Sequence, residues 1–246
     1  MAHIRVHADD LTLESPTLIE GLPGVGLVGK IAADHIVDAF DMTYYADVVC
    51  EGLPKLAIYR ADDPTLRPPV RLYADPDRQL LVLQSDVPVS PTNASDFASC
   101  LTGWLADQDA LPIFLSGLPS DREESPPTLF GTATGNGDEH LSAAGLDAPP
   151  ENGVIAGPTG ALLHQAQEQD LATVGLVVES NPQFPDPEAA HILIRNGITP
   201  MTDIEIGTDE LIDRAEEIRK QREQLAKQMH QADEESSRAE PLRMYQ

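Results

Sequence analysis

A glycine-rich loop between a short apolar stretch and an amphipathic one constrains the fold of this chain most. Residues 17–19 have the composition of a strand, and residues 30–40 carry apolar side chains at helical spacing. Glycines at such a junction allow a tight turn and let the helix approach the sheet closely. The residues that define the loop are Gly21, Pro23, Gly24, Gly26 and Gly29.

The spacing Gly24-x-Gly26-x-x-Gly29 also matches a dinucleotide-binding fingerprint. Glu51 lies 22 residues beyond Gly29, where such a fold places its ribose-binding acid. However, Pro23 and the residues before it separate the glycines from the apolar strand, whereas the fingerprint normally runs from the strand directly into the turn. This spacing alone is therefore a weak indication of a nucleotide sensor.

The same glycines, followed by Lys30, resemble a phosphate-binding P-loop that lacks its last ligand. Ile31 stands where a serine or threonine would supply a hydroxyl to Mg²⁺. We therefore favour a structural role for the glycine loop, in the turn and in helix–sheet packing, and keep anion binding as the alternative.

Strand-like and helix-like stretches alternate along the rest of the chain. Further strands are predicted at residues 43–50, 56–59, 70–73, 80–83, 112–115, 154–156 and 173–178. Helices are predicted at residues 93–105, with Thr92 or Asn93 as the cap, at 160–169, and at 187–196, with Pro187 in the first turn. The alternation predicts a layered α/β fold with helices flanking the sheet, and the hairpin-like spacing of residues 43–84 predicts a mixed sheet.

Two regions depart from this alternation. Residues 116–153 are dense in Gly, Pro, Ser and Asp, so we expect much of this segment to be loop. From Thr208, a plausible N-cap, apolar positions recur every three or four residues with one charged interruption, which predicts a helix lying on its own domain or on partner subunits. The seam consists of Leu211, Ala215, Ile218, Arg222, Leu225 and Met229. The predicted organisation is an α/β domain at 1–206, an amphipathic helix at 207–232 and a flexible tail at 233–246.

The charge of the chain excludes several classes of function. Its 246 residues carry 16 Lys and Arg against 41 Asp and Glu, a formal net charge of −25. Nucleic acids and anionic membranes are bound through Lys and Arg, so neither is an expected partner. No apolar run is long enough to span a membrane and no signal peptide is present, so we expect a soluble, cytoplasmic protein. Because Asp and Glu are distributed along the whole chain, we favour a halophilic adaptation to high salt over an acidic surface that binds a basic partner.

The sequence contains no recognisable catalytic or metal-binding constellation. Cys50 and Cys100 form no CxxC motif and are too few for a cysteine-rich metal site. The seven histidines show no HExxH or paired metal spacing. His35, Glu51 and Asp86 are titrating groups available to an enzyme, but their pattern is not specific to a reaction. No catalytic residue, metal or cofactor is predicted.

Beyond the glycine loop, an ordered series of motifs resembles the archaeal branch of the proteasome-assembly-chaperone family. The match begins with the whole string LIEGLPGVGLVGKIAADHIVDAF and spans about residues 16–196. The later motifs are Phe130-Gly131-Thr132-Ala133-Thr134, Gly157-Pro158-Thr159-Gly160-Ala161-Leu162-Leu163, Gly175-Leu176-Val177-Val178-Glu179 and Pro185-Asp186-Pro187-Glu188-Ala189-Ala190. The resemblance implies a fold similar to purine nucleoside phosphorylases, a homo-oligomer and no established catalytic activity.

The last three residues, Met244, Tyr245 and Gln246, match a hydrophobic-Tyr-any triplet. In this family such a C-terminal triplet docks on the proteasome core, so the resemblance implies the core α subunits as partners. The leading hypothesis is a non-enzymatic assembly chaperone or docking factor. The sequence leaves open whether it assists assembly of the proteasome or activates the mature core. The alternative is an enzyme of the nucleoside phosphorylase type that uses the glycine loop as an anion site.

Overall fold

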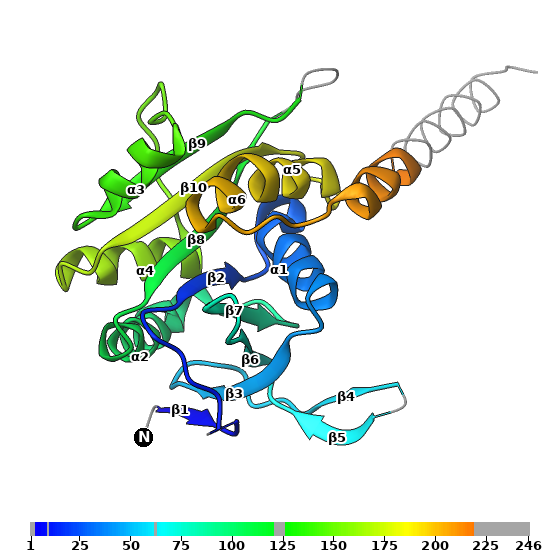
Figure 1. Ribbon diagram of the computed structural model, residues 1–246, viewed down its shortest axis with the longest axis vertical. Helices are drawn as coiled ribbons and strands as arrows, with labels where there is room; N and C mark the ends of the chain where they lie inside the picture. The colour runs from blue at the N-terminus through cyan, green and yellow to red at the C-terminus, as the bar shows by residue number, and fades with distance from the viewer. Residues whose placement is uncertain (1–2, 9, 62, 121–125, 219–246) are drawn as a thin grey trace, which may run out of the picture.

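The computed structural model describes residues 3–8, 10–61, 63–120 and 126–218. Figure 1 shows one body with a central sheet, helices around it and a two-stranded projection. The strands are β1 (His3–Val6), β2 (Thr17–Gly21), β3 (Thr43–Val49), β4 (Ile58–Arg60), β5 (Asp63–Arg67), β6 (Val70–Asp75), β7 (Leu80–Ser85), β8 (Leu111–Pro119), β9 (Leu129–Thr134) and β10 (Thr173–Ser180). The helices are η1 (Val25–Leu27), α1 (Val28–Ala39), η2 (Pro91–Asn93), α2 (Ala94–Asp107), α3 (Gly137–Ala144), α4 (Gly157–Glu168), α5 (Pro187–Ile192), η3 (Leu193–Ile198) and α6 (Thr199–Thr202).

Eight strands form one mixed sheet in the order β1-β3-β6-β7-β2-β8-β10-β9. The central strands β7, β2, β8 and β10 are parallel, whereas β1, β3, β6 and β9 join through antiparallel pairs. The mixed sheet predicted from the sequence is thus confirmed. Strands β4 and β5 pair only with each other, as a separate two-stranded sheet.

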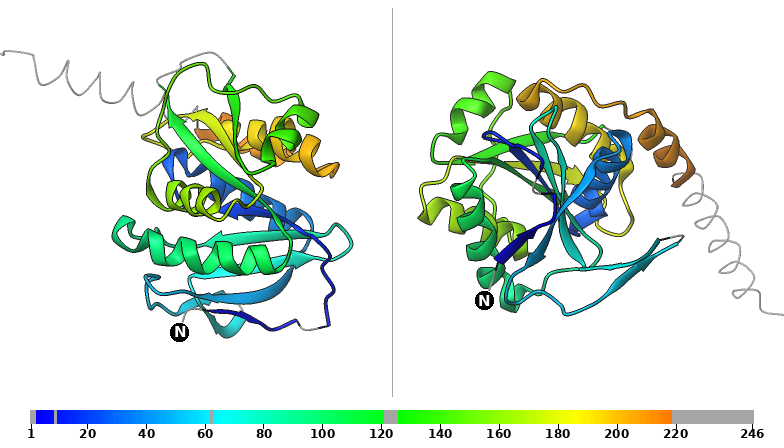
Figure 2. Two further views of the ribbon diagram at one scale, coloured as in Figure 1. Left: turned by 90° about the vertical axis from the view of Figure 1, so that its left-hand side faces the viewer. Right: turned by 60° about the horizontal axis from the view of Figure 1, so that its bottom comes forward.

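Helices cover both faces of the large sheet (Figure 2). On one face, α1, α3, α5 and η3 pack in a core that includes Ile36 and Leu193. On the other face, α2 and α4 supply Phe97 and Leu162. Neighbouring strand residues contribute to opposite cores, as Leu18 and Ile19 do, because successive side chains of a strand point to opposite faces. The layered α/β fold class is confirmed.

Residues 116–153 contain loop, as expected, but also more regular structure than their composition predicts. Strand β8 continues to Pro119, β9 pairs antiparallel with β10, and α3 follows. Thr134 Oγ1 donates to the Leu171 carbonyl, 2.7 Å away, and fixes the end of β9. Asp138 and Glu139 stand in the first turn of α3, where acids favour a helix, and Gly145 ends the helix at φ +69°. Loop composition hid these elements; residues 126–128 and 146–156 are without regular structure.

Two smaller predictions differ from the structure and a third agrees with it. Residues 154–156, expected as a strand, form a loop in which Val154 is 91% exposed, since no neighbouring strand is there to pair with it. Neither predicted cap of α2 is seen: Asn93 occupies the N-cap position without a side-chain cap, and its amide donates instead to the Gly52 carbonyl at 3.4 Å. Pro187 does lie in the first turn of α5, as predicted.

The described part of the C-terminal helix, residues 209–218, begins as predicted after Thr208. Leu211 is fully buried in the core beside α1, and Ala215 and Ile218 are half-buried. The start of this helix therefore lies on its own domain. Arg222, Leu225, Met229 and the predicted tail fall outside the described residues. No helix within the described part of the chain is both long and apolar enough to cross a membrane.

Candidate functional site

The glycine loop lies where β2, the central parallel strand, passes into α1 (Figure 1). Gly21 is the last residue of β2, Val25–Leu27 form the short helix η1, and α1 begins at Val28. The carboxyl ends of β8 and β10 reach the same edge of the sheet, because these strands run parallel to β2. Ligands of open α/β sheets bind at such an edge, so the candidate site lies here.

Close packing accounts for glycine at several positions of the loop. A Cβ at Gly21 would overlap the Ala33 Cβ of α1, and a Cβ at Gly26 would overlap Ser180 Oγ. Gly26 also has φ +61°, in the left-handed region that favours glycine. Gly24 differs, because a Cβ there would meet no atom within 4 Å. These contacts support the interpretation in terms of turn and packing.

Glu20, just before the loop, is a fully buried carboxyl group. It accepts hydrogen bonds from the backbone N–H groups of Leu22 and Leu115, both at 2.9 Å, and from the Thr159 hydroxyl at 3.4 Å. Burial raises the pKa of Glu20 to about 7, although the three hydrogen bonds oppose the rise. Glu20 thus joins β2, β8 and the first turn of α4.

Asp186 ties the loop to α5. Its carboxylate accepts from the Asn181 N–H at 2.9 Å, from the Ala189 N–H at 3.0 Å and from the Ser180 hydroxyl at 3.3 Å. Its own N–H donates to the carbonyl of Gly26 at 2.8 Å. The backbone of the glycine loop is therefore engaged by its own chain at this point.

Motifs far apart in the sequence meet around the glycine loop. Thr159, from the Gly157–Leu163 motif, reaches Glu20, and the Pro185–Ala190 motif supplies Asp186. The Phe130–Thr134 motif lies further away, as edge strand β9. Sequence reasoning missed both Glu20 and its partner. The available signal was a lone acid inside the apolar run Thr-Leu-Ile-Glu-Gly, where a charge is seldom found without hydrogen-bond partners.

A second polar cluster lies beside the first turns of α1. Arg71 is fully buried, and its guanidinium contacts the carboxylate of Asp86, the amide oxygen of Gln84 and, at 3.2 Å, the Tyr73 hydroxyl. Lys30 Nζ lies 4.0 Å from Asp86. Burial would raise the pKa of Asp86, but the hydrogen bond and charge of Arg71 outweigh it and hold this pKa below its usual value.

The titrating groups considered for an enzyme are not brought together. His35 Nε2 donates to the Gly207 carbonyl at 2.6 Å, Asp86 is paired with Arg71, and Glu51 is exposed in the turn after β3. Strands β6 and β7 separate β3 from β2, so Glu51 does not follow a neighbour of the glycine-loop strand. Within the described residues, no group of three or more His, Cys, Asp or Glu is placed to hold a metal ion.

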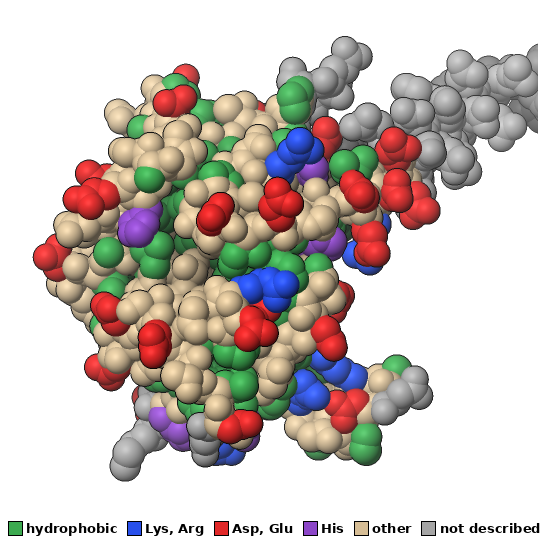
Figure 3. All heavy atoms as spheres, viewed as in Figure 1, with side chains coloured by type: hydrophobic (Ala, Val, Ile, Leu, Met, Phe, Trp, Pro, Cys, Tyr) green, Lys and Arg blue, Asp and Glu red, His purple; other side chains and the backbone are tan. Residues whose placement is uncertain are grey.

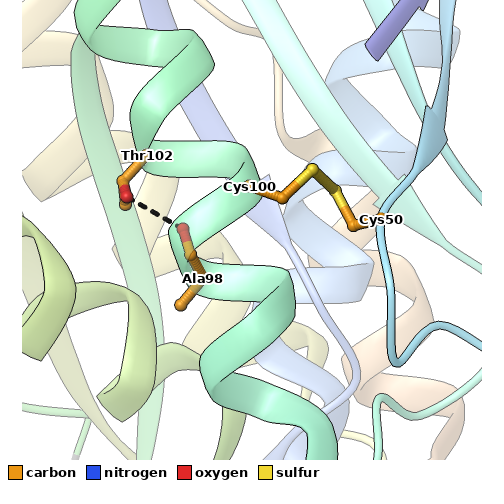
Figure 4. The surroundings of a disulfide bond; sticks show 4 residues. All are labelled: Cys50, Ala98, Cys100 and Thr102. Carbon is orange, nitrogen blue, oxygen red and sulfur yellow. Dashed lines mark hydrogen bonds between the residues drawn. A yellow bond between two sulfur atoms is a disulfide. The ribbon is translucent and has the colours of Figure 1, made fainter. Parts of the chain in front are cut away.

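A disulfide joins Cys50, just after β3, to Cys100 on α2, with Cα atoms 5.9 Å apart (Figure 4). This pairing was not predicted from the sequence, where the two cysteines show neither a CxxC motif nor a metal-site pattern. Met244, Tyr245 and Gln246 lie outside the described residues.

On the surface, Asp and Glu side chains occur over most of the face shown in Figure 3. Adaptation to high salt stays a prediction.

Comparisons with known proteins agree over nearly the whole chain. Residues 18–226 match the PAC2 family. An uncharacterized protein of Methanocaldococcus jannaschii is 28% identical over 220 residues, covering 89% of this chain and 88% of the relative. The crystal structure of Pyrococcus furiosus PbaA, an archaeal homolog of proteasome-assembly chaperone, is similar with a TM-score of 0.75 and 26% identity, covering 94% of this chain and 99% of PbaA. Pyrococcus furiosus PbaB, an archaeal proteasome activator, shares the fold with a TM-score of 0.76 at 22% identity, covering 92% and 98% of the two chains.

Proposed function

This chain belongs to the PAC2 family, and from that membership we propose that it is a non-enzymatic proteasome assembly chaperone or docking factor. The observation that carries the proposal is the similarity to PbaA over nearly the full length of both chains. The site supports it, because Glu20 and Asp186 use their hydrogen bonds to fix the glycine loop. A domain whose loops are fixed in this way can serve as a rigid scaffold for a segment that binds the partner.

In this proposal the C-terminal triplet makes the contact with the proteasome core. Met244 offers an adaptable apolar side chain, and Tyr245 an aromatic ring with a polar tip. A carboxylate on Gln246 is a group that a lysine or a nest of backbone amides in an α-subunit pocket can bind. Residues 233–246 could reach at most about 50 Å when extended.

Self-association is the second part of the proposal. A homo-oligomer that presents several tails to a ring of α subunits binds more tightly than one tail does, since later contacts form at high effective concentration. Weak contacts by single triplets would then suffice.

The experiment is a pull-down with the cognate proteasome α subunits in concentrated salt, with the full chain as bait. Removal of residues 244–246, or Tyr245→Ala alone, should abolish capture. Gln246→Ala is the matched control and should capture normally, because the pattern accepts any residue at the last position. Two residues added after Gln246 should also block capture by moving the carboxylate. Equal capture by the full and truncated chains would refute the tail mechanism.

A further inference from the structure

Asparagine precedes glycine at three places in the chain, Asn136-Gly137, Asn152-Gly153 and Asn196-Gly197. Such pairs are chemically labile, because the backbone nitrogen of the second residue can attack the side-chain amide carbon of the asparagine, and glycine has no side chain to obstruct the approach. The attack requires the asparagine backbone to rotate out of a helical conformation. The structure around each pair therefore decides whether the pair reacts.

Two of the pairs are held in helices, and both of their glycines are buried. Asn136 is the N-cap of α3, and a Cβ at Gly137 would lie 2.2 Å from the carbonyl oxygen of Thr173 in β10. Asn196 lies inside η3, and a Cβ at Gly197 would lie 2.7 Å from a leucine side chain of the same strand. Neither backbone can rotate unless its helix unwinds from the sheet.

The pair Asn152-Gly153 lies in the loop between α3 and α4, in a different environment. Residues 146–156 are without regular structure, and residues 147–154 are all exposed. A Cβ at Gly153 would meet nothing within 4 Å, so no packed neighbour holds the backbone there. Among the described residues, no backbone carbonyl accepts from the Gly153 N–H. The loop can therefore rotate to bring the Gly153 nitrogen to the side-chain amide of Asn152.

We propose that Asn152 is a modification site, at which the folded protein converts asparagine to isoaspartate without an enzyme. The Gly153 nitrogen gives up its proton and forms a bond to Asn152 Cγ, while the Cγ–Nδ2 bond breaks and the amide nitrogen leaves with that proton as ammonia. Water then opens the succinimide ring. Isoaspartate results when the bond from the main-chain carbonyl carbon of Asn152 to the Gly153 nitrogen breaks, and aspartate when the bond at Cγ breaks.

The conversion should leave the fold intact. Neither hydrophobic core includes a residue of the exposed segment 147–154, and the next side chain, Val154, is 91% exposed. The loop can take up the extra backbone atom, and the new carboxylate lies in water, where a charge costs little. The product is therefore an exposed isoaspartyl carboxylate on a folded protein, a group that carboxyl methyltransferases specific for isoaspartate recognise.

The first test ages the full chain in concentrated salt at mildly alkaline pH and digests samples with pepsin in acid, where the reaction stops. Mass spectrometry locates the converted residues, and enzymatic carboxyl methylation of the undigested protein counts isoaspartate. We expect residue 152 to convert at least tenfold faster than Asn136 or Asn196, with an unchanged melting temperature of the aged protein. Equal rates at the three pairs, or no conversion at residue 152, would overturn the proposal.

The second test separates the effect of the structure from that of the sequence. Gly153→Ala fits the loop, since Gly153 has no positive φ and has open space around it, but its methyl group obstructs the attacking nitrogen. Conversion at residue 152 should fall at least fivefold. Gly103→Ala, at another glycine with open space, is the matched control and should leave the rate unchanged.

In denaturant the selectivity should disappear, because all three asparagines then precede a glycine in an unfolded chain. Comparable rates at the three positions in denaturant, together with fast conversion only at residue 152 in the folded protein, would support the proposal. A preference for residue 152 that persists in denaturant would refute the role of the fold. These measurements omit the proteasome, so their outcome is independent of binding by the tail.

Discussion

The hydroxyl of Thr159 lies 3.4 Å from the carboxylate of Glu20, although 139 residues separate the two in the sequence. This contact links the first turn of α4 to the end of the central strand β2. The glycine loop and the Gly157–Leu163 motif are therefore parts of one arrangement around a buried carboxyl group. The carboxyl group at its centre has a pKa of about 7, raised from 4.5 by burial, which gives the arrangement a testable pH dependence.

Glu20→Gln should change how stability depends on pH. Because the folded-state pKa is raised, the wild type is relatively most stable below the unfolded value of 4.5 and loses that stability as the pH rises towards 7. The glutamine variant has no such loss. The free energy of unfolding of the variant minus that of the wild type should therefore increase by roughly 3 kcal/mol between pH 4.5 and 8. Denaturant melts at constant salt measure it, with the exposed Glu151→Gln as the control. A difference that does not change with pH would contradict the buried, hydrogen-bonded carboxyl.

Gly26→Ala should destabilise the protein, whereas Gly24→Ala should not. Alanine at position 26 would adopt φ +61° and overlap Ser180 Oγ, at a combined cost of about 2–4 kcal/mol. Gly24 has extended backbone angles and free space, so alanine there should be neutral or stabilising by about 0.5 kcal/mol. Thermal and urea unfolding would show the contrast, and Ser180→Gly added to Gly26→Ala should recover part of the loss. Equal effects at the two positions would refute the packing role.

The local features of this fold were predictable because they depend on neighbouring residues. The strand, glycine loop and helix at residues 17–40 follow from periodicity, and the hairpin spacing of residues 43–84 predicted a mixed sheet. Strand β9 and helix α3 were missed because tertiary pairing with β10 and a first turn of acids outweighed a loop-like composition.

The parts of the site that involve distant residues could not be predicted in the same way. The partner of Glu20 depends on where α4 begins in space, and the burial of Arg71 depends on the side chains that α1 and β7 bring to it. The Cα atoms of the two cysteines lie 5.9 Å apart, although the residues are 50 positions apart in the sequence. A disulfide requires such proximity in space, and spacing in the sequence does not specify it. The two cysteines were considered only for metal binding and for a CxxC motif, and their spacing in the sequence does not say whether they pair.

Cys100→Ser should lower stability only under oxidising conditions. A cross-link that closes a loop of 50 residues restricts the unfolded chain and stabilises the folded one by about 4 kcal/mol. Unfolding in denaturant with and without reductant should show that the wild type, when reduced, is about as stable as Cys100→Ser. Titration of free thiols under denaturing conditions should find none in the oxidised wild type, whose only cysteines are Cys50 and Cys100. Two free thiols, or a stability that reductant leaves unchanged, would contradict the disulfide.

Arg71→Met should be among the most destabilising single changes in the chain. The side chain of Arg71 is fully buried and contacts Asp86, Gln84 and Tyr73, so its removal leaves a partly buried carboxylate without its main partner. Losing one member of a buried pair costs about 3–5 kcal/mol, and the exposure of Asp86 to water should keep the loss near the lower end. Arg5→Met is the control: Arg5 is 57% exposed and lies 3.7 Å from Asp47, so less than about 1 kcal/mol is expected. Asp86→Asn in the Arg71→Met background should restore part of the stability, because the amide carries no charge to leave unpaired. If the double variant were no more stable than Arg71→Met, the cost would lie in lost packing and not in the unpaired charge.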